Sequence, residues 1–283
     1  MKNTDDFKIV KGGNNGKNVL ILGGVHGDEL PGIWAIENVL PKINIKNGLI
    51  TYGIANPKAV KIHKRFTEEN LNRMFYDKNV IDKNSYEYKR AQELKKIMNK
   101  HDILLDLHSS SIKDTPAFAI CEPNSYNIVK NLPVEYIVSG FDEHEPGGTD
   151  YYMNKIGKIG ICIECGYHSS KESKKIAEQS IYNLLAHLNM IDNDKATISS
   201  TQANIYKSKQ KYYKVFYKHF SKTNKFKLKR CFKNFEALRK NELIGYDGIT
   251  EVRAQKDAII LFAHNGSKIG DEVFLLAEKI TSK

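Results

Sequence analysis

Two histidines and one glutamate lie at or near the ends of predicted strands, where they could bind a metal ion. His26 and Glu29 are three residues apart, directly after an apolar run at residues 18–25, and His108 lies near the end of another at residues 102–110. Side chains three apart at a turn entering a helix can reach one ion. Two imidazoles and a carboxylate, with a fourth position left to water, are the ligand set of a catalytic zinc. We therefore predict one zinc ion per chain at these three residues.

A second glutamate has the chemistry to act on water at this site. Glu164 lies inside a third apolar run, KIGICIECG at residues 158–166, where burying a carboxylate is costly unless it has a purpose. Zinc lowers the pKa of a bound water to about 7, so a neighbouring glutamate can accept its proton near neutral pH. We predict that Glu164 is the general base. Asp106 shares a strand face with His108 and could orient that histidine.

Each of these residues could also have a purely structural role. His26 and Glu29 alone would fit an exposed pair at a helix start, where a glutamate is favoured near the positive N-terminus. His108 alone would fit a capping histidine, and Glu164 a strand glutamate paired with a lysine. Their joint occurrence at strand ends favours the zinc site, because the ligand crevice of an open α/β sheet lies at the carboxyl ends of its strands.

The segments that must position these residues alternate between strands and helices. Buried strands are predicted at residues 18–25, 48–55, 102–110 and 158–166, and amphipathic helices at 29–40, 84–100 and 171–190. Such alternation is typical of an α/β sheet with helices packed on it. Short strand-like runs punctuated by Gly, Asn and Asp follow near the end of the chain and predict a small all-β domain.

These patterns predict two domains. We expect an α/β domain over residues 1–195, with a mixed sheet and helices on both faces, and a small β-domain over residues 200–283. The polar, aperiodic stretch at residues 191–204 is interpreted as a linker. The formal net charge of +11 agrees with this division, because residues 201–245 hold 13 basic and 2 acidic residues and so carry the whole excess.

The basic segment at residues 205–235 interleaves lysines with tyrosines and phenylalanines. That mixture suits a platform for single-stranded nucleic acid. It equally suits a β-domain whose aromatic residues form the core and whose lysines face water and protect edge strands. We favour the β-domain and expect no nucleic-acid partner. A third interpretation is that the basic face steers an anionic substrate towards the zinc site.

Composition excludes several protein classes. Hydrophobic residues make up 41% of the chain and charged residues 27%, with a mean hydropathy of -0.49, which suits a packed globular protein. No apolar run approaches the roughly 20 residues of a membrane helix, and no Sec-type signal peptide is visible. Four cysteines are too few for a disulfide framework, and Cys162 and Cys165 read as small core residues. We expect a cytoplasmic protein with reduced thiols and no membrane partner.

Four sequence blocks, in order, carry a resemblance to a known family. They are GGVHGDELPG, NPKAVKIHKRFTEENLNRMF, DLHSSS and IECG, spread over roughly residues 18–166. This pattern resembles the aspartoacylase/succinylglutamate desuccinylase family, which belongs to the zinc carboxypeptidase-like superfamily. The resemblance implies zinc on His26, Glu29 and His108, with Glu164 as general base and proton shuttle.

The resemblance also implies roles for the second block. Arg65 would polarise the scissile carbonyl and stabilise the oxyanion, and Asn72 and Arg73 would bind a substrate carboxylate, which a guanidinium matches with two parallel hydrogen bonds. Alone, these residues would fit a solvated, charged loop. Two features depart from the family: Asn70 stands where an aspartate is common, and no arginine lies between His108 and Glu164 to contact a second carboxylate.

The expected reaction is hydrolysis of an amide bond in a small substrate that bears a carboxylate. A zinc-dependent N-acyl amino acid deacylase is the first hypothesis. A zinc carboxypeptidase acting on the C-terminal residue of short peptides is the second, since the same residues would serve it. A non-enzymatic anion or nucleic-acid binder acting through residues 205–235 is the third.

Overall fold

The computed structural model describes residues 6–192 and 209–281. Contacts divide the chain into two compact units. The first unit comprises residues 1–137 and 145–210, and the second comprises residues 138–144 and 211–283. Most of the predicted linker at residues 191–204 and the start of the basic segment lie outside the described residues.

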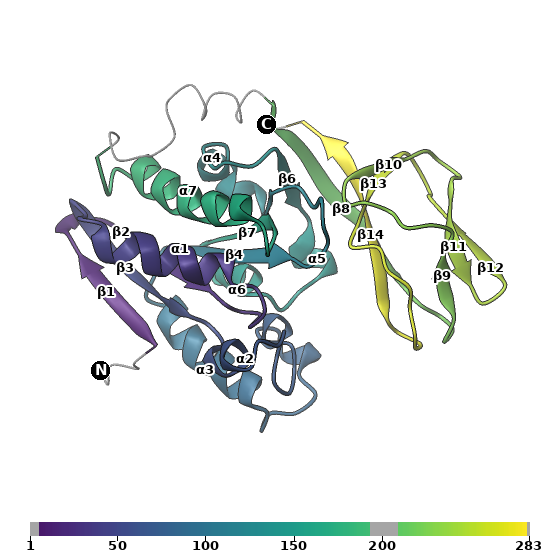
Figure 1. The fold of residues 1–283 in the computed structure, drawn as a ribbon, viewed down its shortest axis with the longest axis horizontal. Coiled ribbons are helices and arrows are strands. Elements are labelled where there is room, and N and C mark those ends of the chain that lie inside the picture. The colour runs from purple at the N-terminus through teal and green to yellow at the C-terminus, as the bar shows by residue number, and fades with distance from the viewer. Residues whose placement is uncertain (1–5, 193–208, 282–283) are drawn as a thin grey trace. The chain divides into compact units, whose positions relative to one another are not determined.

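The first unit is an α/β structure (Figure 1). Its strands are β1 (Phe7–Lys11), β2 (Gly13–Gly23), β3 (Asn47–Ile54), β4 (Ile103–Ser110), β5 (Phe118–Cys121) and β7 (Ile159–Tyr167). Its helices and helical turns are α1 (Pro31–Val39), η1 (Leu40–Lys42), α2 (Pro57–Lys61), η2 (Leu71–Arg73), η3 (Asp77–Asn79), α3 (Tyr86–Met98), η4 (Pro123–Ser125), α4 (Tyr126–Val129), α6 (Thr149–Lys155) and α7 (Lys171–His187). β6 (Tyr136–Ser139) crosses the boundary between the units.

The sheet of the first unit is mixed. Its strands follow the order β1-β3-β2-β4-β7-β5. β3, β2, β4 and β7 are parallel neighbours, whereas β1 and β5 pair antiparallel at either side of them. The parallel arrangement brings the carboxyl ends of β2, β4 and β7 to the same edge. The four strands expected from the sequence are present, and β1 and β5 add to them.

Helices cover both faces of this sheet, as expected. On one face, Leu20, Leu22 and Leu104 pack against Ala91 and Leu94 of α3 in one buried cluster. On the other face, α1 and α7 pack against each other and against β2, β4 and β7. Burial of these apolar side chains, at roughly 25 cal/mol per Å² of apolar surface, is the main stabilising contribution. No helix in the described part of the chain is long and apolar enough to cross a bilayer.

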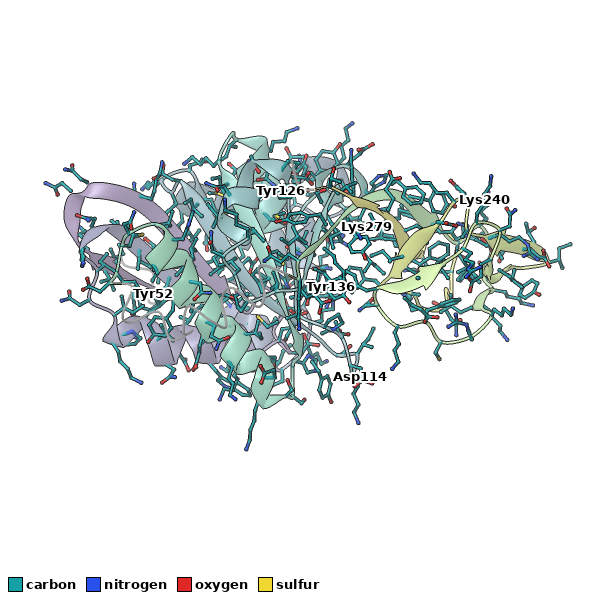
Figure 2. All side chains as sticks on the ribbon, turned by 90° about the horizontal axis from the view of Figure 1, so that it is seen from above. Tyr52, Asp114, Tyr126, Tyr136, Lys240 and Lys279 are labelled. Atoms are coloured by element: carbon teal, nitrogen blue, oxygen red, sulfur yellow. The ribbon has the colours of Figure 1, made fainter. Side chains whose placement is uncertain are left out.

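The second unit is built from antiparallel strands. It contains α5 (Phe141–His144), β8 (Lys211–Phe220), β9 (Phe226–Leu228), β10 (Glu236–Leu238), β11 (Leu243–Asp247), β12 (Thr250–Arg253), β13 (Ala258–Leu261) and β14 (Glu272–Ile280). β8, β14, β13 and β10 are successive neighbours, and β12, β11 and β9 form a separate three-stranded sheet. Aromatic residues of the basic segment enter its core, with Phe226 and Phe232 buried. Lys240 and Lys279 project from its surface (Figure 2).

Candidate active site

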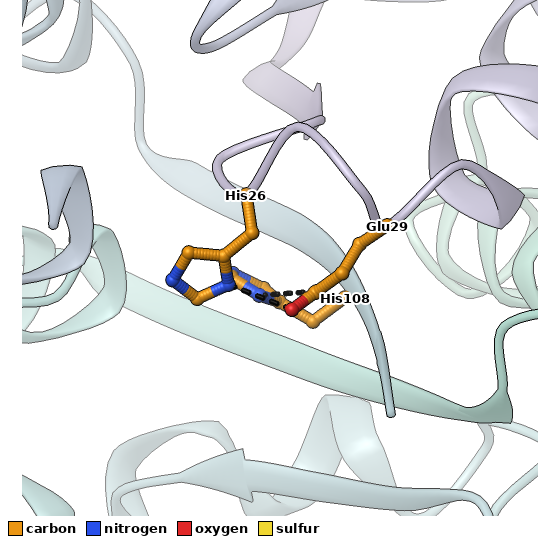
Figure 3. A group of neighbouring side chains, drawn as sticks. All are labelled: His26, Glu29 and His108. Atoms are coloured by element: carbon orange, nitrogen blue, oxygen red, sulfur yellow. Dashed lines mark hydrogen bonds and ion pairs between the residues drawn. The ribbon is translucent and has the colours of Figure 1, made fainter. Parts of the chain in front are cut away.

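Glu29 joins two histidines from different elements at the carboxyl edge of the parallel strands (Figure 3). His26 and Glu29 lie in the loop between β2 and α1, and His108 lies on β4. Glu29 Oε1 is 2.8 Å from His26 Nδ1, and Oε2 is 3.0 Å from His108 Nδ1. The three side chains offer ligand atoms within 4.8 Å of one another, and all three are buried. The structure thus brings together the three residues expected to bind zinc.

Close backbone packing shapes the turn that carries two of these residues. Gly27 lies between them, and a Cβ atom there would come within 2.1 Å of the carbonyl carbon of Ala59 in α2. Only glycine allows this approach. Gly27 N also donates to the carbonyl oxygen of Arg65 at 3.2 Å, so the turn and the segment after α2 hold each other in place.

Polar groups behind the histidines favour the orientation that a metal would need. His26 Nε2 lies 3.0 Å from Asn70 Oδ1. His108 Nε2 lies 3.1 Å from Asp106 Oδ2, an electrostatic contact without hydrogen-bond alignment. Acceptors at both Nε2 atoms favour the proton there and leave each Nδ1 lone pair for a metal. Ser109 N donates to Glu29 Oε2 at 2.9 Å and fixes that carboxylate as well.

The ionisation of the three side chains reflects their burial and mutual contacts. Burial alone would raise the pKa of Glu29, but His26 and His108 hold it well below the ordinary value. Burial alone would lower the pKa of His108, yet Asp106 and Glu29 raise it well above the ordinary value. Burial lowers the pKa of His26 despite Glu29. A metal ion would compete with the proton on His108, because imidazole binds metals in its neutral form.

Glu164 lies beside His108 in the sheet. The two residues are register partners on β7 and β4, so their side chains share one face. Glu164 Oε2 is buried and has no hydrogen-bond partner in the described part of the chain. Burial, followed by the charge of Glu29, raises the pKa of Glu164 to about 7. A carboxyl group with this pKa can take up and release a proton near neutral pH.

Arg65 reaches the same cluster from the segment after α2. Its Nη1 donates to Glu29 Oε1 at 3.1 Å, while half of its side chain is exposed. A guanidinium in this position can bind a developing negative charge. The contact with Glu29 places the Arg65 side chain at the candidate metal site.

A buried glutamate of α3 fixes the segment that carries Arg65, Asn72 and Arg73. Glu87 accepts hydrogen bonds from Thr67 N and Oγ1 and from the backbone N–H groups of Glu68 and Glu69. It also accepts one from Asn56 Nδ2 at 3.2 Å. Burial alone would raise the pKa of Glu87, but these donors lower it. The segment is therefore held by a charged acceptor rather than by regular secondary structure.

Asn72 and Arg73 lie together in η2 and contact the start of α6 and the segment just before it. Asn72 Oδ1 accepts from Thr149 N at 3.3 Å. Arg73 Nη2 forms an ion pair with Glu145. Thr149 Oγ1 in turn donates to Asp106 Oδ2, and this links the segment to His108.

Sequence reasoning missed several of these contacts. Glu145 and Thr149 lie in the polar, glycine-rich stretch at residues 141–152, for which the sequence predicts either a lining of the substrate pocket or an ordinary connection. Asn70 was noted as a departure from the family and not as a partner of His26. Their roles depend on contacts across 43 to 77 residues of sequence, which spacing alone does not reveal. In the stretch without an arginine between His108 and Glu164, Lys155 and Lys158 are lysines that could contact a second substrate carboxylate, but Lys158 donates to the carbonyl oxygen of Asn99 at 2.6 Å.

The sequence of this chain is similar to that of known proteins. Residues 15–188 match the model of the succinylglutamate desuccinylase/aspartoacylase catalytic domain. An N-acyl-aromatic-L-amino acid amidohydrolase of Danio rerio is 27% identical over 174 residues, covering 52% of this chain and 52% of that protein. A probable aspartoacylase of a Nostoc species is 27% identical over 194 residues, covering 60% of this chain and 63% of the relative.

The matched region spans only about half the length of the first of these curated relatives. The fold similarity extends further. The structure of a succinylglutamate desuccinylase of Vibrio parahaemolyticus superimposes with a TM-score of 0.79, at 20% identity, over 98% of this chain and 86% of that one. At this level of identity the superposition establishes a common fold.

Proposed function

This chain belongs to the succinylglutamate desuccinylase/aspartoacylase family, and from that premise we propose that it is a zinc-dependent hydrolase of N-acyl amino acids. One observation carries the proposal. His26, Glu29 and His108 present two imidazoles and a carboxylate within 4.8 Å of one another, and Glu164 is the register partner of His108. The acylamino acid hydrolases among its relatives support the same reaction class.

The residues present fit a zinc ion. Their donor set is the one that catalytic zinc sites use, and Asn70 and Asp106 lie at the distal nitrogens of the two histidines, as is usual behind metal-bound imidazoles. A bound zinc ion would supply Lewis acidity towards a carbonyl group and towards water. His26, Glu29 and His108 would hold it.

The remaining steps depend on side chains of this chain. Glu164 would accept a proton from the attacking water at a carboxylate oxygen and deliver it to the leaving amine nitrogen, which its pKa of about 7 permits. Arg65 would stabilise the negative charge that develops on the carbonyl oxygen. Asn72 and Arg73 would bind the carboxylate of the amino acid.

Hydrolysis assays with zinc-loaded and chelator-treated protein test this proposal. The panel should contain N-acetyl amino acids and dipeptides of the same amino acids, with release of the free amine as the readout. We expect zinc-dependent release from the N-acetyl compounds and slower release from peptides. Faster cleavage of the peptides would favour a carboxypeptidase, and no release from any compound would contradict the proposed function.

A further inference from the structure

Arg73, the proposed carboxylate-binding residue, already has an acidic partner. Its Nη2 forms an ion pair with Glu145, and its Nη1 donates to the backbone oxygen of Asn72 at 3.1 Å. The Arg73 side chain is 31% exposed and that of Glu145 only 10%. The pair is thus partly withdrawn from water, where charge interactions are screened less than at an open surface.

The backbone around Glu145 is fixed against the segment that carries Arg73. The carbonyl oxygen of Pro146 accepts from Asn79 Nδ2 at 2.7 Å, and that of Gly147 accepts from Phe75 N at 3.2 Å. Gly147 has a φ of 113°, and a Cβ atom there would lie 2.7 Å from the carbonyl oxygen of Arg73. These backbone contacts hold Glu145 beside Arg73, so the ion pair does not depend on the two side chains alone.

In the described part of the chain, the side-chain amide of Asn72 contacts the protein through its oxygen only. Its Oδ1 accepts from Thr149 N at 3.3 Å, and its Nδ2 has no hydrogen-bond partner among residues 6–192 and 209–281. The Asn72 and Arg73 pair can therefore donate to a carboxylate, while Glu145, next to them, can accept from a cation.

This combination discriminates between substrates by charge. A substrate whose only charge is one carboxylate would have to compete with Glu145 for Arg73, and two carboxylates in a partly desolvated place repel each other. A substrate that carries a carboxylate and a nearby ammonium would match both protein charges. No arginine lies between His108 and Glu164, so an acidic amino acid finds no guanidinium on that stretch to bind its second carboxylate with two parallel hydrogen bonds.

We propose that Glu145 is a specificity-determining residue that selects N-acyl amino acids with a cationic side chain, such as Nα-acyl derivatives of diamino acids. The α-carboxylate binds Asn72 and Arg73, and the side-chain ammonium binds Glu145. This inference rests on the proposed function, since it names the substrate class of the same site.

An isosteric pair of substrates tests the inference. Nα-acetyl-L-ornithine and Nα-acetyl-L-norleucine differ by an ammonium in place of a methyl group. We expect kcat/KM of the zinc-loaded wild-type protein to favour the ornithine compound by about 10-fold or more, the usual size of a charged hydrogen bond. In Glu145→Gln that ratio falls to about one. The matched control is Asp77→Asn, an exposed acidic residue two positions before Asn79, which keeps the wild-type ratio.

Two results would overturn the inference while the proposed function stands. One is equal hydrolysis of both compounds by the wild-type protein. The other is a parallel loss of both activities in Glu145→Gln with an unchanged ratio, because a residue that only orients Arg73 would affect both substrates alike.

Calorimetric binding of the free amino acids keeps the test decisive if neither compound is hydrolysed. That result would contradict the proposed deacylase but not the selectivity of the site. Tighter binding of L-ornithine than of L-norleucine, lost in Glu145→Gln, would support the inference. Equal binding of the two amino acids, or no binding of either, would overturn it.

Discussion

The candidate site and the second unit bury carboxylates in opposite ways. At the site, Glu164 Oε2 and Asp106 Oδ1 are buried without a hydrogen-bond partner among the described residues. In the second unit, Asp247 is buried and both of its oxygens accept from the turn after β8: from Lys222 N at 2.7 Å and from Thr223 N and Oγ1 at 3.0 and 2.6 Å. Unsatisfied buried carboxylates cost stability, so their concentration in one place indicates chemistry, whereas a saturated carboxylate indicates support for a loop.

The same contrast exists within the first unit. Glu87 accepts from backbone and side-chain donors of the segment after α2, and in this respect it resembles Asp247. The pKa of each carboxyl group depends on whether hydrogen bonds compensate its burial. Burial is the largest cause that raises the pKa of Glu164 to about 7. Although burial opposes it, hydrogen bonds lower the pKa of Glu87 and of Asp247. Substitutions at these three residues should therefore have distinct effects.

Glu164→Gln should have the largest effect on activity. Loss of the proton acceptor should lower kcat for an N-acetyl amino acid by about 10²–10⁴-fold. Zinc content and melting temperature should stay at or above wild-type values, because the lost carboxylate oxygen Oε2 makes no hydrogen bond to the described residues. Glu37→Gln, on the exposed side of α1, is the control and should change none of these. Unchanged kcat in Glu164→Gln would remove Glu164 from its proposed role.

Glu87→Gln should affect stability first and activity through it. In the wild-type protein, backbone N–H groups donate to the carboxylate oxygens of Glu87. In the variant, an amide NH₂ group faces some of these donors and cannot accept from them, so we expect the free energy of unfolding to fall by about 2–3 kcal/mol. The segment carrying Arg65, Asn72 and Arg73 loses its acceptor, and KM for an N-acetyl amino acid should rise. Guanidinium unfolding and steady-state kinetics measure both. The control is Glu93→Gln, at an exposed residue of the same helix. If the two variants were equally stable, Glu87 would not have the supporting role assigned to it.

Asp247→Asn should lower stability by an amount that depends on pH, because the ionised carboxylate of Asp247 accepts several hydrogen bonds. Because its folded-state pKa is lowered, the stabilisation is complete above the ordinary value of 3.8 and disappears as the pH falls through the lower folded value. The variant should therefore be about 2 kcal/mol less stable than wild type at neutral pH, and the difference should shrink in acid.

Denaturant unfolding of the full chain across the acidic range measures this difference. Glu251→Gln, which removes an exposed ion pair with Arg253, should change stability by less than about 1 kcal/mol at every pH. A difference between wild type and Asp247→Asn that stays constant down to strongly acidic pH would contradict the role assigned to the ionised Asp247.

The sequence predicts the part of the site that depends on regular structure. Apolar runs identify the parallel strands, and carboxyl ends of neighbouring parallel strands meet at one edge. For that reason His26, Glu29, His108 and Glu164 could be grouped before the fold was known. β1 and β5 escaped prediction because one is a short edge strand with two lysines and the other has only four residues.

Contacts between irregular segments could not be predicted in the same way. The ion pair between Arg73 and Glu145 and the contact of Asn70 with His26 depend on how loops fold against each other. Loop conformation is set by individual hydrogen bonds, such as those to Glu87, and these leave no periodic pattern in the sequence. Specificity is therefore harder to predict from sequence than the metal ligands.

Metal content tests the central claim most directly. Wild-type protein should be stripped with a chelator, incubated with zinc, passed over a desalting column and analysed by mass spectrometry of the metal, beside His108→Ala treated identically. We predict about one zinc ion per wild-type chain and little retained zinc in a His108→Ala variant whose circular dichroism shows that it is folded. Wild-type protein without retained zinc, or equal zinc in the two proteins, would contradict the account.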